Sequence, residues 1–207
     1  MARIDDYIAA RGLAVAALSE ESILHIAKRS GFGLEGEHAF RVPFLNRIYK
    51  VSYPGFDFTD VNDNEKEVPI QEQVLILHYM QGGERQNPLS ADRIAYREIK
   101  GASFYFSSFV KRAIDPLKKV FGNTVSGFKK VAGILGGEPV ANGDAGFNFQ
   151  LLPKISLQII LWEGDDEFPP EANILFEDSI GEFLSPEDVA WLSGMLVYRL
   201  ISISYQK

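Results

Sequence analysis

The sequence predicts an α+β fold in which helices pack against a mainly antiparallel sheet, with a helix at each end of the chain. Residues 38–53 alternate apolar and polar side chains, as half-buried strands do. Ile155–Trp162 is a nearly continuous apolar run, which indicates a strand in the centre of a sheet. Ser185, followed by a proline and two acids, is a strong helix start, so we expect the last helix to begin there.

Before residue 38 the sequence predicts two helices. Ile4 and Ile8 share one face of the first helix, which Gly12 is expected to interrupt. Ser19 is the expected N-cap of the second helix, because two acids follow it in the first turn. Gly31 is its expected C-cap, because glycine readily adopts the left-handed conformation that ends helices.

The next part of the chain predicts a hairpin, a loop and a helix. Residues 38–53 should turn near Asn46, because strand-forming residues lie on both sides of it. Residues 57–67 are polar and are expected to form a loop. Pro69 suits the first position of a helix, which Gly82 and the glycine after it should end.

Residues 94–99 are expected to form a further strand. Ser103 is the expected cap of a helical segment that should break at residues 115–116, because the residue before a proline disfavours helical geometry. Shorter helices then continue to residues 136–137.

Two more strands, 147–151 and 173–176, are predicted on either side of the apolar run. The final helix should bury Val189, Leu192 and Leu196, which recur at helical spacing.

Composition favours one acidic domain. The 207 residues suit a single domain, and the net charge of −7 disfavours nucleic-acid and anionic-membrane binding. No apolar run approaches the roughly 20 residues that span a bilayer, and no signal-peptide pattern is present, so we expect a cytoplasmic protein. Without cysteine this chain cannot form a disulfide, a thiolate zinc site or a thiolate-held iron–sulfur cluster.

Two stretches resemble ligand-binding motifs without fulfilling them. Residues 31–36 match GxGxxG, but a helix precedes them and a hairpin follows, so a helix end and turn fit better. Residues 60–64 begin like a calcium loop, yet Glu65 and Gln71 stand where an EF-hand needs Gly and Glu. A solvated loop is the favoured interpretation of that stretch.

The stretch from Trp162 to Asp188 is the best site candidate in the sequence. It contains ten acids and neither Lys nor Arg. Aromatic residues, which favour burial, alternate with carboxylates, which need water or a cation. The aromatic residues are Trp162, Phe168, Phe176 and Phe183.

Carboxylates that follow the apolar strand suggest a metal or acid–base site. Asp165, Asp166 and Glu167 are oxygen ligands suited to Mg²⁺ or Ca²⁺. The favoured interpretation is nevertheless a turn, because Gly164 and the aspartates after it are typical turn residues. His78 joins the candidates, because an imidazole in a very apolar helix needs a partner. The candidate binding residues are His78, Trp162, Asp165, Asp166, Glu167, Phe168, Glu177 and Asp178.

The middle of the chain is basic. The lysine and arginine side chains there recur at helical spacing, and they are expected to form a solvated face. A docking patch for an acidic surface or a phosphate, and pairing with the chain's own acidic stretch, are the alternatives. The residues are Lys111, Arg112, Lys118, Lys119, Lys129 and Lys130.

Short motifs distributed along almost the whole chain, from about residue 5 to 203, carry a family resemblance. Each motif is weak alone, and their order and spacing together are more specific. They are Val42-Pro43-Phe44-Leu45 with Tyr49, Leu75–Met80, Phe121-Gly122, Leu135-Gly136-Gly137 with Gly143-Asp144, Leu152-Pro153, Leu161–Pro169, Ile174-Leu175-Phe176 and Glu187-Asp188.

With these motifs the chain resembles an uncharacterised bacterial and archaeal family, the domain-of-unknown-function family 3786. The resemblance implies no established activity. Some relatives are joined to a cysteine-rich iron–sulfur segment, which implies a redox setting. Since this chain has no cysteine, a redox role would require a separate partner protein.

Two classes of function follow from the sequence. The first is a binding or accessory module for a small ligand or a partner protein, because no complete catalytic motif occurs. The second is a carboxylate-based enzyme, with or without a divalent cation, that uses the acidic segment 163–178. An enzyme should gather at least three of the candidate groups in one concave site, whereas a module should show them spread apart beside exposed apolar surface.

Overall fold

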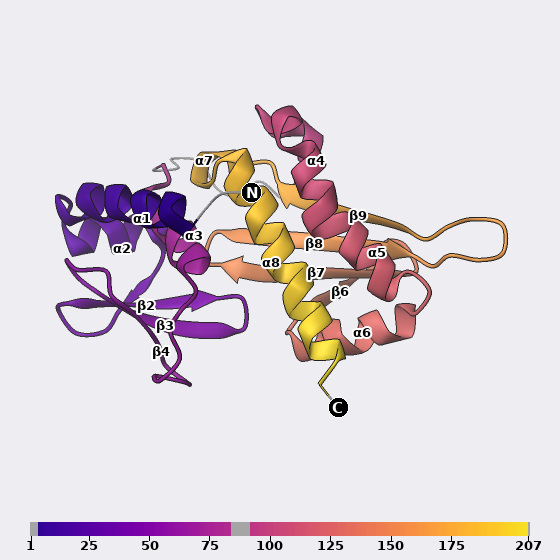
Figure 1. Cartoon of the computed structure of the whole chain (residues 1–207), viewed down its shortest axis with the longest axis horizontal. Helices are drawn as coiled ribbons and strands as arrows, with labels where there is room; N and C mark the ends of the chain where they lie inside the picture. The colour runs from indigo at the N-terminus through magenta and orange to yellow at the C-terminus, as the bar shows by residue number, and fades with distance from the viewer. Residues whose placement is uncertain (1–3, 84–91, 207) are drawn as a thin grey trace. The chain divides into compact units, whose positions relative to one another are not determined.

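Helices and antiparallel strands make up most of the computed structural model, which describes residues 4–83 and 92–206 (Figure 1). The packing divides the chain into two units. The first unit holds the described residues up to 83 and two short returning segments, 152–154 and 182–184. The second unit holds the rest, and α7 (Ile180–Phe183) crosses the division. The fold class is α+β, as predicted.

The first unit contains an antiparallel sheet in the order β1-β2-β3-β4. Phe44 pairs with Arg47 across the hairpin, so the chain turns at Leu45 and Asn46, as predicted. Leu45 takes a positive φ of 54° in this two-residue turn, as the tight hairpin geometry requires. The strands are β1 (Gly33–Leu34), β2 (Ala39–Phe44), β3 (Arg47–Ser52) and β4 (Phe58–Asp60).

Three helices complete the first unit, and α3 is the central one because α1 and α2 both pack on it. The C-cap predicted at Gly31 is confirmed, since its φ is +77° and its amide donates to the Ala27 carbonyl at 2.8 Å. Gly82 follows the end of α3, also as predicted. The helices are α1 (Ile4–Ser19), α2 (Ile23–Ser30) and α3 (Ile70–Gln81).

The second unit is built on a sheet in the order β5-β9-β8-β7-β6. The apolar run forms β8 in the centre of this sheet, as predicted, and all of it except Trp162 is buried. One face carries aromatic side chains such as Phe176, whose ring lies 6.0 Å from that of Phe109 in the adjoining helical segment. The strands are β5 (Arg93–Ala95), β6 (Glu138–Val140), β7 (Ala145–Leu152), β8 (Ile155–Trp162) and β9 (Glu171–Glu177).

The helices of the second unit gather around α8, which contacts α4, α5 and α6 (Figure 1). The predicted cap is confirmed, because the Ser185 hydroxyl accepts a hydrogen bond from the Asp188 amide. None of the described helices combines the length and the apolarity that a membrane span requires. The helices are α4 (Phe106–Phe109), a π-helical turn (Val110–Ile114), α5 (Asp115–Phe121), α6 (Val125–Ile134) and α8 (Pro186–Ser204).

Two predicted boundaries near the N-terminus are wrong. Gly12 does not interrupt α1, which continues to Ser19, because a single glycine costs a helix only about 1 kcal/mol and packing on α3 can override that cost. Ser19 is therefore the end of α1 and not a cap. The cap of α2 is Ser22, whose side chain accepts from the His25 amide at 3.2 Å.

Other boundaries shift because of sheet pairing. The stretch 57–67 is not all loop, since residues 58–60 pair with β3 as β4. The expected strand 94–99 ends at Ala95, and a 3-10 turn follows it. The Glu98 carboxylate accepts from the Ala95 amide at 2.6 Å, which favours that turn. β9, expected at 173–176, extends over seven residues.

Ser103 caps no helix, because it lies within a 3-10 turn, Ala102–Phe104. The break expected at residues 115–116 is also wrong, since helical structure runs from Phe106 to Phe121. The π-helical turn comes just before, so Pro116 falls in the first turn of α5, where its missing N–H is tolerated.

Candidate functional site

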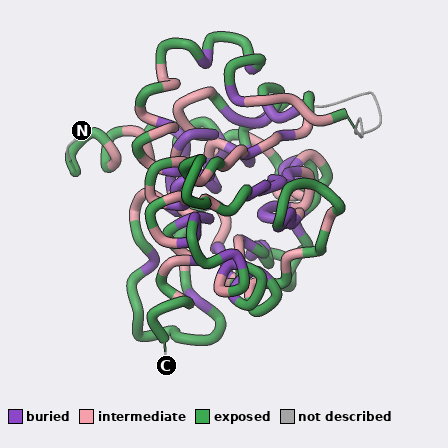
Figure 2. The backbone as a smooth tube through the Cα atoms, turned by 90° about the vertical axis from the view of Figure 1, so that its right-hand side faces the viewer, coloured by how far each residue is buried: buried purple, intermediate pink, exposed green. Residues whose placement is uncertain are grey.

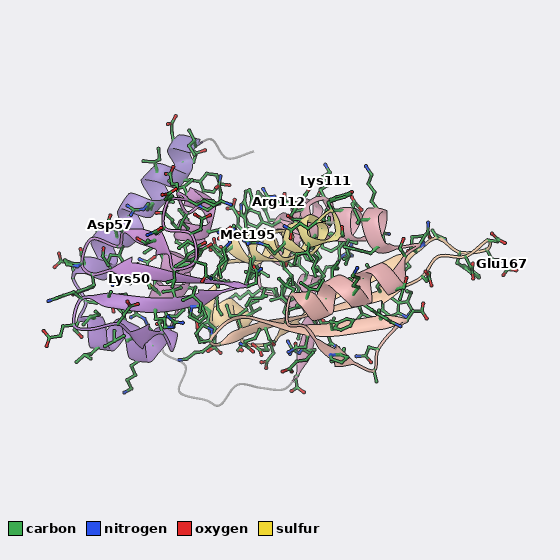
Figure 3. All side chains as sticks on the ribbon, turned by 90° about the horizontal axis from the view of Figure 1, so that it is seen from below. Lys50, Asp57, Lys111, Arg112, Glu167 and Met195 are labelled. Carbon is green, nitrogen blue, oxygen red and sulfur yellow. The ribbon has the colours of Figure 1, made fainter. Side chains whose placement is uncertain are left out.

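The acidic residues after β8 form a loop that projects from the end of the second unit's sheet. Trp162 at the end of β8 pairs with Glu171 at the start of β9, and residues 163–170 connect them. We call residues 163–170 the finger. Figures 1 and 3 both show the finger extending beyond its unit's sheet and helices, with Glu167 near its outer end.

The base of the finger is fixed by hydrogen bonds that its backbone amides donate. The Gly164 amide donates to the Gly122 carbonyl at 3.0 Å, and the Glu163 amide donates to Asp144 Oδ2 at 2.8 Å. A Cβ at Gly164 would lie 2.6 Å from Pro170 Cδ, so only glycine fits there without rearrangement. The finger therefore leaves the sheet in a defined direction.

The outer part of the finger is organised by Asp165. Its Oδ1 accepts hydrogen bonds from the Glu167 amide at 2.8 Å and the Phe168 amide at 2.7 Å. The Asp165 amide donates to the Phe168 carbonyl at 2.9 Å, which closes the bend. The amides of Phe168 and Glu167 lower the pKa of the Asp165 carboxyl below its ordinary value. Asp165 is thus an ionised residue that holds a tight bend, as the turn interpretation predicts.

The four aromatic residues of the acidic stretch divide into two pairs. Phe176 and Phe183 are buried, whereas Trp162 is 42% exposed and Phe168 is 67% exposed. Asp166 and Glu167 are exposed beside Phe168. The finger consequently presents an aromatic side chain and carboxylates together to solvent, while Phe176 and Phe183 serve the core.

The structure does not bring Glu177 and Asp178 to the finger. Glu177 ends β9, six residues from Glu171, which is roughly 20 Å along a strand. Asp178 follows Glu177. His78 is a half-buried residue of α3 in the first unit. Within residues 4–83 and 92–206, no group of three or more His, Asp or Glu side chains is arranged to hold a metal ion. The metal prediction for Asp165, Asp166 and Glu167 stays a prediction.

Sequence reasoning did not find the polar network that contains Glu177. The Ser156 hydroxyl donates to Glu177 Oε1 at 2.9 Å and accepts from Arg93 Nη2 at 2.8 Å. The same Nη2 donates to Asn148 Oδ1 at 2.9 Å, so the network crosses four strands. Ser156 and Gln158 are buried polar residues within the apolar run, and they are the sequence signal that could have revealed it.

A second unpredicted polar cluster lies in the first unit. Arg47 forms an ion pair with the buried Asp60, and the Tyr49 hydroxyl donates to Glu72 in the first turn of α3. Partial burial opposes the charge of Arg47, but the hydrogen bond to Asp60 and the nearby negative groups raise its pKa above the ordinary value. The calcium-like residues 60–64 thus begin with a carboxylate that an arginine neutralises.

Part of the basic segment contacts the acidic stretch. Such pairing is one of the three interpretations that the sequence allows for these basic residues. Lys118 Nζ lies 3.7 Å from Glu171 Oε2, at the base of the finger. Arg112 instead covers the ring of Trp191, with its Cζ 4.1 Å from the ring centroid. These contacts leave the outer acids of the finger, Asp166 and Glu167, facing solvent.

A comparison with protein-family models matches residues 22–199 to the domain of unknown function DUF3786. The chain belongs to the DUF3786 family. No curated protein and no solved structure matches it. The DUF3786 match includes the finger and both sheets, whereas α1 lies before the matched range. The family resemblance stated from the sequence is therefore confirmed.

Proposed function

We propose that this DUF3786 protein is a binding module, and that its finger binds a basic, partly apolar surface of a partner protein. The single observation that supports this proposal most is the exposure of Phe168 beside Asp166 and Glu167 on a loop with a fixed base. Large apolar side chains that project from a defined loop are typical anchors of interfaces, and charged side chains form their rim.

The physical gain from such binding can be estimated. Complete burial of one phenylalanine side chain contributes about 1.5–3 kcal/mol, which is roughly tenfold to a hundredfold in affinity. The fixed base lowers the entropy lost on binding, because the loop is ordered beforehand. The carboxylates and the net charge of −7 favour a basic partner and speed its association at low salt.

A finger substitution with a matched control tests the proposal. Phe168→Ser removes the anchor, and Phe104→Ser changes another exposed phenylalanine of the same unit. Proteins that co-purify at low salt should be quantified for both variants and the unchanged chain. We expect a partner with a basic surface that the control retains and Phe168→Ser loses at least tenfold. Equal retention by both variants would contradict the proposal. The first partner class to examine is a separate redox protein, because the family resemblance implies a redox setting.

The enzyme hypothesis makes a different prediction, which a binding measurement can check. If the carboxylates of the finger hold Mg²⁺ or Ca²⁺, the joint change Asp165→Asn and Asp166→Asn should abolish cation binding in equilibrium dialysis. Asparagine at residue 165 keeps a side-chain oxygen for the bend, so the loop should survive. Cation binding that persists in this variant would make the hypothesis wrong in this form.

A further inference from the structure

Helix α1 exposes three large apolar side chains. Leu13 is 75% exposed, Ile4 57% and Ile8 56%. Of the sixteen residues of α1, only Ala14 and Leu18 are buried. Figure 2 shows the same pattern, since the helix near the N mark is mostly in the colours for exposed and intermediate residues. A surface helix ordinarily places polar residues on its outer face, so this arrangement needs an explanation.

The inner face of α1 is attached by polar contacts as well as apolar ones. Arg11 Nε donates to Gln73 Oε1 and Arg11 Nη2 donates to the Phe56 carbonyl, both at 2.7 Å. These bonds direct the one basic residue of α1 inward. They also fix which face of the helix points outward, because a rotation of α1 would break both. The rotation of α1 that turns this face outward is therefore fixed.

The outer face has the shape of a helix-docking surface. Ala9, Gly12 and Ala16 recur at spacings of three and four residues, so they form one column along the helix. Ile8 and Leu13 stand on the two sides of this column. A Cβ at Gly12 would meet nothing within 4 Å among the described residues, so packing inside the unit gives no reason for glycine there. A column of small residues between larger apolar ones lets a second helix approach closely.

Charge decides which helix fits. Asp5 lies at the start of the column and Glu20 one turn beyond Ala16, and both are exposed. A second copy of α1 would place acid against acid in either orientation, which disfavours self-association. We propose that the outer face of α1 docks an amphipathic helix of a partner protein that carries lysine or arginine at both ends of its apolar stripe. This surface is independent of the finger and belongs to the other unit.

Two synthetic helical peptides test this proposal with the complete chain. Both carry the same leucine and alanine stripe, and the first has lysines in its first and last turns where the second has glutamates. Binding of the labelled peptides is followed by fluorescence anisotropy. We expect the lysine-ended peptide to bind at least tenfold more tightly than the glutamate-ended one, and to lose at least tenfold in affinity for Leu13→Glu. Equal binding of the two peptides would overturn the proposal.

Four further measurements keep the outcome interpretable. Leu24→Glu changes an exposed leucine of α2 in the same unit and should leave binding unchanged. Gly12→Leu raises helix propensity and fills the open column, so it should preserve folding and still weaken binding. A dimer in native mass spectrometry that Leu13→Glu dissociates would assign the face to a second copy and overturn the proposal. Phe168→Ser should leave peptide binding intact, which separates this result from that of the finger.

Discussion

Helices α1 and α8 are both rich in apolar residues, yet they use them differently. α8 buries residues from Val189 to Leu200 within its own unit, whereas α1 buries only Ala14 and Leu18. The apolar surface of α8 is thus explained by the helices and sheet that it helps to cover. The apolar surface of α1 is larger than the part that its own unit buries. Apolar content alone therefore does not show which face of a helix is buried. The buried residues of α8 are Val189, Ala190, Leu192, Ser193, Gly194, Leu196, Val197 and Leu200.

The largest expected difference between the helices is the cost of removing a leucine. Leu196→Ala leaves a cavity at a fully buried position of α8 and should lower the free energy of unfolding by about 2–5 kcal/mol. Leu13→Ala removes the same atoms from an exposed position of α1 and should change it by less than about 0.5 kcal/mol. Urea unfolding of the two variants measures both values. Similar losses in both would mean that α1 is part of a core.

A smaller difference in stability between the two helices is expected when a serine at one end of each is changed to alanine. Ser185 caps α8 through the Asp188 amide, so Ser185→Ala should cost about 1 kcal/mol. Ser19 ends α1, and its hydroxyl donates to the Ala16 carbonyl at 3.0 Å on the surface. Ser19→Ala should therefore change stability by no more than about 0.5 kcal/mol. Thermal unfolding of the two variants gives the comparison. A larger cost for Ser19→Ala would show that it has a structural role.

These contrasts explain why some features were predictable. The cap at Ser185 and the glycine at Gly31 act through local geometry, so nearby residues sufficed to predict them. Gly12 is different, because packing on α3 overrides its weak local preference. Strand β4 depends on pairing with β3 and on the contact between Asp60 and Arg47, which lie thirteen residues apart. Local composition does not encode such partners.

The candidate site shows the same division. The bend at Asp165 followed from local turn chemistry, and the structure contains it. The exposure of Phe168 and the burial of Phe176 depend on how the finger and the sheet are placed in space, so similar residues in one acidic stretch have opposite roles. The network of Arg93 and Ser156 depends on the pairing of strands far apart in sequence, and only the buried serine gave a local sign of it.

The smallest expected effect concerns the connection between α1 and α2. The Glu21 carboxylate accepts hydrogen bonds from Arg29 Nη1 at 2.7 Å and Nη2 at 2.9 Å. These bonds lower the pKa of Glu21 below its ordinary 4.5, although partial burial acts in the opposite direction. Because the folded-state pKa is the lower one, the pair stabilises the fold above pH 4.5, and this contribution is lost as the pH falls through the lowered pKa.

Glu21→Gln should therefore reduce stability at pH 7 by less than about 1 kcal/mol, because the pair is partly exposed and screened by solvent. The difference between variant and unchanged chain should shrink as the pH falls below 4.5. Urea unfolding at pH 7 and at a pH near 3 measures it, with Glu20→Gln as the exposed control. A difference that is the same at both pH values would mean that Glu21 acts through packing. A difference that shrinks would mean that the connection between α1 and α2 is held to α2 by an ionic contact, whereas α8 is held by apolar burial that does not titrate.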